Sequence, residues 1–315
     1  MIGRRTFCLA MASALAPAQI AHAQDRKVRV STPGPAITTL PTEVVRVKGF
    51  DKEEGLALNV TPSAGAIAVK AMVAGDFDFC LSVGAALIGA VNGAPVKVIY
   101  VHVDKWLYFL YAAAGISSLH ELEGKRIAVD AAGGTLDVIV RRAMQSSGAG
   151  AGSTAFISMG NIGNVPAALI AGAVDAGVIT PPQEFQLLHS ARKFKNLGFL
   201  GDYAPGITGG IAAANKTLQE YPDMVRAFLK AHAKAHKFIL DNREETIPIV
   251  SRFLNLSAED AASAYDTTIR PFYTTGGAVS PEQQAVFIAE LARGLKTTPV
   301  TDPKACFDFS FLPRA

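Results

Sequence analysis

The segment RIAVDAAGGTLDVIVRRAM, which runs from Arg126 to Met144, contains residues that could bind an anion through the backbone. An apolar run is followed by Gly133, Gly134 and Thr135, where a helical pattern begins. Backbone N–H groups at the start of a helix lack partners within the helix, and glycine lets a ligand approach them closely. We therefore expect a cradle for an anion or a carbonyl group, with Thr135 as the N-cap residue. A tight turn that needs glycine only for its own shape explains this one loop equally well.

Five other predicted strands end in similar loops. Their residues are small, most carry a hydroxyl or an amide, and none of the chosen loop segments contains a charged side chain. Ligands of open α/β sheets collect at the carboxyl ends of the strands, so we expect these loops to form one uncharged site. With the first loop, the candidate ligand-binding residues are Thr32, Pro33, Gly34, Ser63, Ala64, Gly65, Ser82, Val83, Gly84, Gly133, Gly134, Thr135, Asn161 and Thr180.

Lys105 and Trp106 form a further candidate contact. Trp106 is the only tryptophan of the chain, and its ring could stack on a ligand while Lys105 supplies a cation. An amphipathic strand, with the ring on the edge of the core and the lysine in solvent, is the alternative.

Motifs for catalysis and cofactors are weak. The segment GAGAGS, from Gly148 to Ser153, follows a predicted helix and precedes a strand, which is the reverse of the order that dinucleotide binding requires. His232 and His236 lie four residues apart on a predicted helix, but no third metal ligand is patterned with them. We therefore expect no catalytic residue, no metal and no cofactor. An exported enzyme that uses Lys105 or Asp130 is the alternative hypothesis.

The N-terminus has the pattern of an export signal. Arg4 and Arg5 precede an apolar run from Phe7 to Leu15, and small residues end at Ala23. This order predicts a cleavable signal peptide over residues 1–23 and a periplasmic protein, with a twin-arginine signal as the alternative to the general export route.

The remaining composition restricts the partners. Residues 24–315 carry 28 basic and 27 acidic side chains, which gives a net charge of +1. Nucleic-acid binding usually needs a basic stripe, so we expect no nucleic-acid partner. Export would permit a disulfide between Cys80 and Cys306, but two separate buried thiols are the favoured interpretation.

Strand-like and helix-like patterns alternate along the chain. Short apolar runs such as KVRVST, LALNVT, VKVIYVHV and RIAVD are each followed by a helical pattern, which predicts parallel sheets built from βαβ units. A mostly helical region follows residue 214, with Met224, Phe228, Ala231 and Ala235 on one face of a long helix.

Five segments together resemble the nitrate/sulfonate/taurine-type solute-binding proteins of ABC importers, a group related to thiamine-pyrimidine precursor proteins. The segments are GFDKEEGLALNV, AMVAGDFDF, ISSLHELEGKRIAV, GGTLD and LIAGAVDAGVITPP. The resemblance implies the type II periplasmic-binding-protein fold, with two α/β lobes of mixed, mainly parallel sheets joined by two crossover strands.

The resemblance also implies lobe boundaries and partners. Lobe one would comprise residues 24–112 and 211–315 and lobe two residues 113–210, with crossovers near Ala112–Gly115 and Thr208–Ile211. A monomer would capture a small organic anion, a sulfonate or carboxylate, in the cleft and deliver it to a membrane permease. An exported enzyme of the same fold, acting on a pyrimidine-like or carboxylate substrate, is the alternative.

Overall fold

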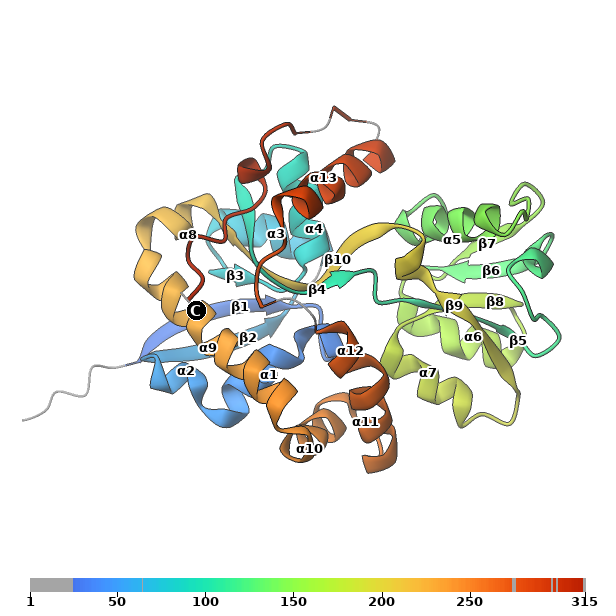
Figure 1. Ribbon diagram of the computed structural model, residues 1–315, viewed down its shortest axis with the longest axis horizontal. Coiled ribbons are helices and arrows are strands. Elements are labelled where there is room, and N and C mark those ends of the chain that lie inside the picture. Colours follow the sequence, from blue (N-terminus) through green and yellow to red (C-terminus); the bar gives the residue numbers. More distant parts are fainter. Residues whose placement is uncertain (1–24, 64, 274–275, 296, 299, 314–315) are drawn as a thin grey trace, which may run out of the picture.

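Two five-stranded sheets, each flanked by helices, lie side by side in the protein (Figure 1). The computed structural model describes residues 25–63, 65–273, 276–295, 297–298 and 300–313. The predicted α/β fold with two mixed sheets is confirmed. The signal peptide expected over residues 1–23 lies outside the described residues.

The first sheet gathers its parallel strands at one edge. Strand β1 runs parallel to β2 and β3, whereas β10 runs antiparallel to β3 and β4. Val28 and Val30 alternate with solvent-facing residues on β1 and are fully buried, as the period of two predicts. The strand order is β2 (Leu56–Pro62), β1 (Arg26–Thr32), β3 (Phe79–Cys80), β10 (Pro205–Ala214) and β4 (Val96–Lys105).

The second sheet repeats this plan. Strand β6 runs parallel to β7 and β8, and β5 runs antiparallel to β8 and β9. The strand order is β7 (Ala155–Ser158), β6 (Arg126–Val129), β8 (Ala176–Ile179), β5 (Phe109–Ala113) and β9 (Phe194–Phe199).

Corresponding ion pairs show how alike the two halves are. Arg29 on β1 pairs with Asp78 at 2.7 Å, and Arg126 on β6 pairs with Asp175 at 2.8 Å. Each aspartate lies in the turn just before the next strand of its sheet, so the pair joins a strand to the turn beside it.

The chain passes between the sheets twice. It leaves β4 after Lys105 and enters β5 at Phe109, and it leaves β9 after Phe199 and enters β10 at Pro205. Both passages therefore lie N-terminal to the positions expected near Ala112–Gly115 and Thr208–Ile211. The reason is that Ala112 already pairs with β8 and β9, while Gly209 to Ile211 already pair with β4.

Helices cover both faces of each sheet (Figure 1). Helices α3, α4 and α13 pack on one face of the first sheet and α9 on the other, whereas α5 and α6 lie on opposite faces of the second. No helix among the described residues is both long and apolar enough to cross a bilayer. The helices are α1 (Leu40–Lys48), α2 (Phe50–Glu53), α3 (Gly65–Ala74), α4 (Val83–Val91), α5 (Thr135–Ser146), α6 (Val165–Ala171), α7 (Pro181–Leu188), α8 (Asn215–Glu220), α9 (Pro222–Asp241), α10 (Arg243–Leu254), α11 (Ala258–Ala264), α12 (Arg270–Phe272) and α13 (Pro281–Leu295).

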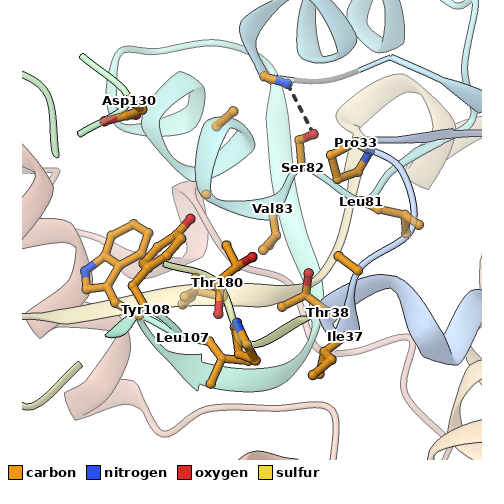
Figure 2. Close-up of a pocket in the computed structure, with 18 of the residues that line it drawn as sticks. Pro33, Ile37, Thr38, Leu81, Ser82, Val83, Leu107, Tyr108, Asp130 and Thr180 are labelled. Atoms are coloured by element: carbon orange, nitrogen blue, oxygen red, sulfur yellow. Dashed lines mark hydrogen bonds between the residues drawn. The ribbon is translucent and has the colours of Figure 1, made fainter. Parts of the chain in front are cut away.

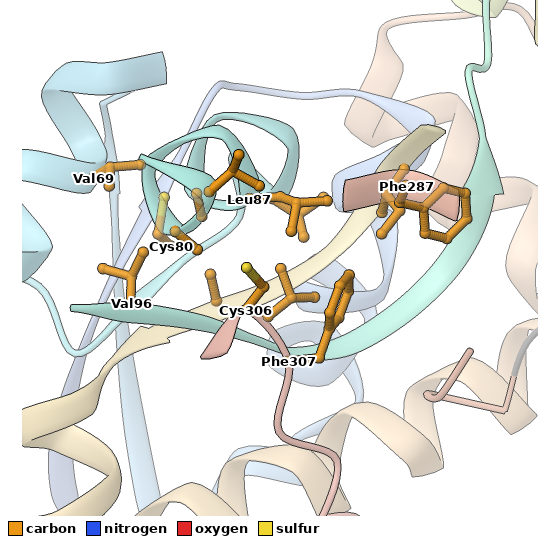
Figure 3. Close-up of a cluster of buried hydrophobic side chains, with 14 of the residues drawn as sticks. Val69, Cys80, Leu87, Val96, Phe287, Cys306 and Phe307 are labelled. Atoms are coloured by element: carbon orange, nitrogen blue, oxygen red, sulfur yellow. The ribbon is translucent and has the colours of Figure 1, made fainter. Parts of the chain in front are cut away.

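Cys80 and Cys306 are separate buried thiols in one apolar cluster of the first sheet (Figure 3). Cys80 lies on β3, and the segment of Cys306 pairs beyond β4, so that β10 and β4 lie between them. Three strand spacings of about 4.8 Å exceed the reach of a disulfide, about 7 Å between Cα atoms. The preference for free thiols over a disulfide is confirmed.

Three histidines are buried beside the first sheet: His102, His232 and His236. His102 on β4 contacts the main-chain oxygen of Thr38, and His232 on α9 contacts Thr42 Oγ1 and the main-chain oxygen of Phe228. Burial, joined for His102 by the neighbouring His236, lowers the pKa of His102 to about 3, and burial lowers the pKa of His232 to about 4. These partners leave His232 no free ring nitrogen for a metal, and the described residues contain no cluster of metal-ligating side chains.

The free energy of unfolding is expected to fall as the pH drops below about 6.5, the ordinary pKa of histidine. The folded state keeps His102 and His232 neutral while the unfolded state protonates them, so acid favours unfolding until the folded-state pKa values are reached. At pH 5 each histidine would remove about 2 kcal/mol of stability. Urea titrations from pH 7.5 to 5 measure this slope.

The control for the pH dependence uses one buried and one exposed histidine. His102→Phe should make the slope shallower even if it lowers stability at every pH, whereas His120→Asn, at an exposed position, should leave it unchanged. An unfolding free energy that stays constant between pH 7.5 and 5 would contradict this account of the buried histidines.

Candidate functional site

A cleft of about 520 Å³ lies where the loops of the two sheets meet. The first sheet contributes the loops after β1 and β3, and the second contributes the segments after β6 and β8. The passage from β4 to β5, which joins the two sheets, adds Trp106, Leu107 and Tyr108. Figure 2 shows Thr38, Val83, Tyr108 and Thr180 around one space, with Asp130 at its edge. Loops at the carboxyl ends of parallel strands thus form the walls, as the strand-end pattern predicts.

The N-terminus of α4 supplies backbone donors to this cleft. Ser82 is the N-cap residue, and its Oγ accepts a hydrogen bond from the N–H of Gly65 at 3.2 Å (Figure 2). Helical bonding begins with the N–H of Ala86, so the N–H groups of Val83, Gly84 and Ala85 have no acceptor within the helix. These residues line the cleft, and the helix dipole favours a negative or carbonyl oxygen beside them.

A short turn after β1 adds Ile37 and Thr38. The Oγ1 of Thr39 donates to the main-chain oxygen of Gly34 at 2.9 Å and accepts from the N–H of Ala36 at 3.1 Å, which holds the turn. Ile37 and Thr38 consequently line the cleft. The spacing of strand ends did not identify them, because they belong to a helical turn several residues beyond the strand.

Trp106 and Tyr108 form an aromatic wall in the passage between the sheets. Their rings stack with centroids 6.3 Å apart, and the Nε1–H of Trp106 donates to the main-chain oxygen of Pro205 at 2.9 Å. The ring of Trp106 is therefore fixed by the returning strand β10 and lines the cleft. Lys105 is exposed at the end of β4, with its Nζ 5.9 Å from the ring centre of Phe199, and is not among the residues that line the cleft.

The expectation of an entirely uncharged rim is wrong at one position. Asp130 follows β6 directly and lines the cleft. The expectation considered only Ala132–Thr135 as the loop after β6, and this segment does not include the carboxylate. Burial, followed by the negative charge of Asp130, raises the pKa of Tyr108 to about 12. Tyr108 therefore keeps its proton at neutral pH.

The start of α7 offers the cleft no free main-chain N–H group at its first positions. Thr180 is the N-cap residue, and its own N–H is bonded to the Oε1 of Gln183 at 3.0 Å. Pro181 and Pro182 occupy the first two helical positions and have no N–H groups. This helix therefore contributes shape to the cleft, together with the hydroxyl of Thr180.

The glycine loop before α5 does not provide the expected anion cradle in this structure. The N–H of Gly133 donates to the carboxylate of Asp137 at 2.6 Å, and the N–H of Ala132 donates to the Oγ of Ser158 at 2.8 Å. An acidic side chain of the chain itself thus occupies the place foreseen for a ligand. Gly134, not Thr135, is the N-cap residue, and the structure does not describe the Thr135 side chain.

The other predicted contacts divide into several groups. Gly133 and Gly134 line a neighbouring cavity of about 190 Å³ that shares Ile88 and Trp106 with the cleft. Thr32 and Gly34 line a separate cavity of about 140 Å³. The residues brought together in the cleft are Pro33, Gly65, Ser82, Val83, Gly84, Trp106 and Thr180. Ser63 and Asn161 do not line the cleft, and Ala64 lies outside the described residues.

Polar contacts join the elements of the two sheets on either side of the cleft. Arg142 on α5 forms an ion pair with Glu290 on α13, and the Nε2 of His189 lies 2.9 Å from the carboxylate of Asp260 on α11. The first pair connects α5 of the second sheet with α13 on the first. The second connects the residue that follows α7 with α11, which packs against α10.

The cysteines and histidines of the described residues lie outside the cleft lining. Cys80 and Cys306 are core residues, His102, His232 and His236 are buried, His189 contacts Asp260, and His120 is exposed on a short helical turn. The side chains around the cleft therefore offer hydrogen bonds and aromatic surface, with Asp130 as their one charged group among the residues described.

Comparison with known proteins places this geometry in a family. The model of the family described as NMT1/THI5 like matches residues 40–246. No curated protein matches the chain at a significant level.

Solved structures of low sequence identity share the fold. The aliphatic sulphonate binding protein SsuA from Escherichia coli is 16% identical over 86% of this chain and 92% of its own, with a TM-score of 0.69. The nitrate-binding protein NrtA from Synechocystis PCC 6803 is 14% identical over 92% of this chain and 87% of its own, with a TM-score of 0.68. A cysteine-to-serine mutant of DszB, solved with biphenyl-2-sulfinic acid, is 12% identical over 90% of this chain and 96% of its own, with a TM-score of 0.66.

Proposed function

The chain belongs to the NMT1/THI5-like family, and from this membership and the cleft we propose that it is the solute-binding component of an ABC importer. In this role the protein captures a small organic solute in the periplasm and delivers it to a membrane permease. The observation that carries the proposal is the cleft itself, because loops of both sheets line it and the α4 N-terminus faces it. Sulfonate- and nitrate-binding proteins of the same fold support the proposal.

The cleft favours an organic solute with an acid or carbonyl group. A carboxylate or sulfonate oxygen would accept hydrogen bonds from the N–H groups of Val83, Gly84 and Ala85, where the helix dipole stabilises negative charge. An apolar or aromatic body would lie against Trp106 and Tyr108.

Capture would proceed by closure of two lobes. We propose that lobe one comprises the elements of the first sheet and lobe two those of the second, with the hinge at Trp106–Tyr108 and Leu200–Ala204. A solute that touches both lobes only in the closed form shifts the population toward that form. The pairs Arg142–Glu290 and His189–Asp260 would break when the lobes separate.

An enzyme of the same fold is the second candidate, and Asp130 is the observation that favours it. A partly buried carboxylate beside Tyr108 could serve as a general base for a bound substrate. Recovery of the bound solute, followed by mass spectrometry, separates the two functions, because a receptor returns its solute unchanged.

Ligand addition is expected to change the fluorescence of Trp106, the only tryptophan. Its ring lines the cleft, so a bound solute would displace water from it. A panel of aliphatic and aromatic sulfonates and carboxylates is first screened for an increase in Tm, and each stabilising compound is then titrated. Trp106→Phe should lose the signal but still show an increase in Tm. Compounds that raise the Tm without altering the fluorescence would show that they bind away from Trp106, against the proposed site.

A further inference from the structure

Asp130 introduces a buried acceptor into a cleft that otherwise offers uncharged groups. Its main-chain oxygen accepts a hydrogen bond from the N–H of Gly160 at 3.0 Å, which fixes the backbone after β6. Its Oδ1 is buried and has no hydrogen-bond partner among the described residues. An unpaired buried carboxylate oxygen is costly, and because Asp130 also lines the cleft, a solute donor that pairs with this carboxylate would offset part of that cost.

The neighbours of Asp130 restrict the kind of donor. Tyr108 lies close enough for the negative charge of Asp130 to contribute to its raised pKa, so the carboxylate borders the aromatic wall. The described residues that line the cleft include no lysine, arginine or histidine that could neutralise Asp130. An anion without a donor group that bound against Trp106 and Tyr108 would be repelled by the carboxylate of Asp130. No cationic side chain in the described cleft lining would offset this repulsion.

The cleft therefore has two unlike recognition groups. The α4 N-terminus, from the first sheet, offers N–H groups and the positive end of a helix dipole. Asp130, from the second sheet, offers an acceptor with a negative charge. A solute that satisfies both must carry an acceptor at one position and a donor at another.

On the basis of the proposed solute-binding function, we propose that Asp130 is a specificity-determining residue that accepts a hydrogen bond from an N–H group of the solute, either an amine or an amide. The acid or carbonyl group of the same solute faces the N-terminus of α4. An anion of equal size without the N–H group leaves the carboxylate of Asp130 without this hydrogen bond and binds more weakly.

The test uses matched pairs of compounds in which an ammonium group, which donates hydrogen bonds and carries a positive charge, replaces a methyl group of similar size. One pair is 4-(aminomethyl)benzoate and 4-ethylbenzoate, and the other is 3-aminopropanesulfonate and butane-1-sulfonate. In calorimetry, the amino member of at least one pair is expected to bind the wild-type protein about tenfold more tightly than its partner. Asp130→Ala should remove this preference, and Asp130→Asn, which keeps the shape and a neutral acceptor, should reduce it.

A matched control removes a negative charge elsewhere. Asp223 is exposed in the first turn of α9, outside the cleft lining and the proposed hinge, so Asp223→Asn should leave the preference unchanged. Equal binding of both members of each pair to the wild-type protein, or a preference that survives in Asp130→Ala, would overturn the role of Asp130 and leave solute binding intact. If no sulfonate or carboxylate of the wider panel raises the Tm, the proposed function itself fails, and this inference fails with it.

Discussion

Gly206→Ala is expected to lower the affinity for any stabilising solute by about tenfold or more, equivalent to about 1.4 kcal/mol. A Cβ at this position would lie 2.0 Å from Cε2 and 2.1 Å from Nε1 of Trp106, so the ring would have to move. The movement would also break the hydrogen bond from Trp106 to Pro205. Calorimetric titration with the most stabilising compound of the panel measures the loss.

A double mutant distinguishes displacement of the ring from general damage. If Gly206→Ala acts through Trp106, it should cost little further affinity in a Trp106→Ala background. Gly152→Ala is the matched control, because a Cβ there meets nothing within 4 Å. Wild-type affinity in a folded Gly206→Ala protein would show that the position of the Trp106 ring is unimportant for binding.

Gly210→Ala is expected to destabilise the protein by about 3 kcal/mol, the upper part of the usual range for overpacking. Its Cβ would lie 2.3 Å from the main-chain oxygen of Tyr100 on the paired strand β4, and a carbonyl within a sheet cannot swing away as a side chain can. The expected fall in Tm is on the order of 6–12 °C. Differential scanning calorimetry measures it.

The comparison for this variant is Gly115→Ala, in an exposed turn where a Cβ has no neighbour within 4 Å. Similar Tm values for the two alanine variants would mean that β10 and β4 can separate locally without cost. The pairing of β10 with β4 at the register shift between Gly209 and Gly210 would then be loosely packed.

Much of the fold could be predicted because local patterns and tertiary packing agree. Val28 and Val30 alternate with polar residues on a strand, and Met224 and Phe228 share the buried face of α9. The antiparallel insertion of β10 into the first sheet was harder to predict, since its small residues show little alternation. The need for glycine at 206 and 210 depends on Trp106 and Tyr100, which are distant in the sequence.

The candidate site was only partly predictable for a similar reason. Ser82 to Gly84 follow a strand and begin a helix, and this local pattern placed them correctly at the cleft. The glycine loop before α5 has the same pattern, but Asp137 in its first turn takes the N–H of Gly133. An acidic residue four positions after such a glycine was the available signal, because first-turn carboxylates compete for these donors. Thr38 enters the cleft through a turn that no strand-end rule describes.

The central claim is that one solute is held between the two sheets, against α4 on one side and against Tyr108 and Asp130 on the other. A crystal structure with the panel compound that raises the Tm most tests this claim directly. The account predicts a compound in the cleft that contacts loops of both sheets, with its acidic oxygen at the N–H groups of Val83 to Ala85. A compound bound outside the cleft, or touching the loops of one sheet only, would contradict it.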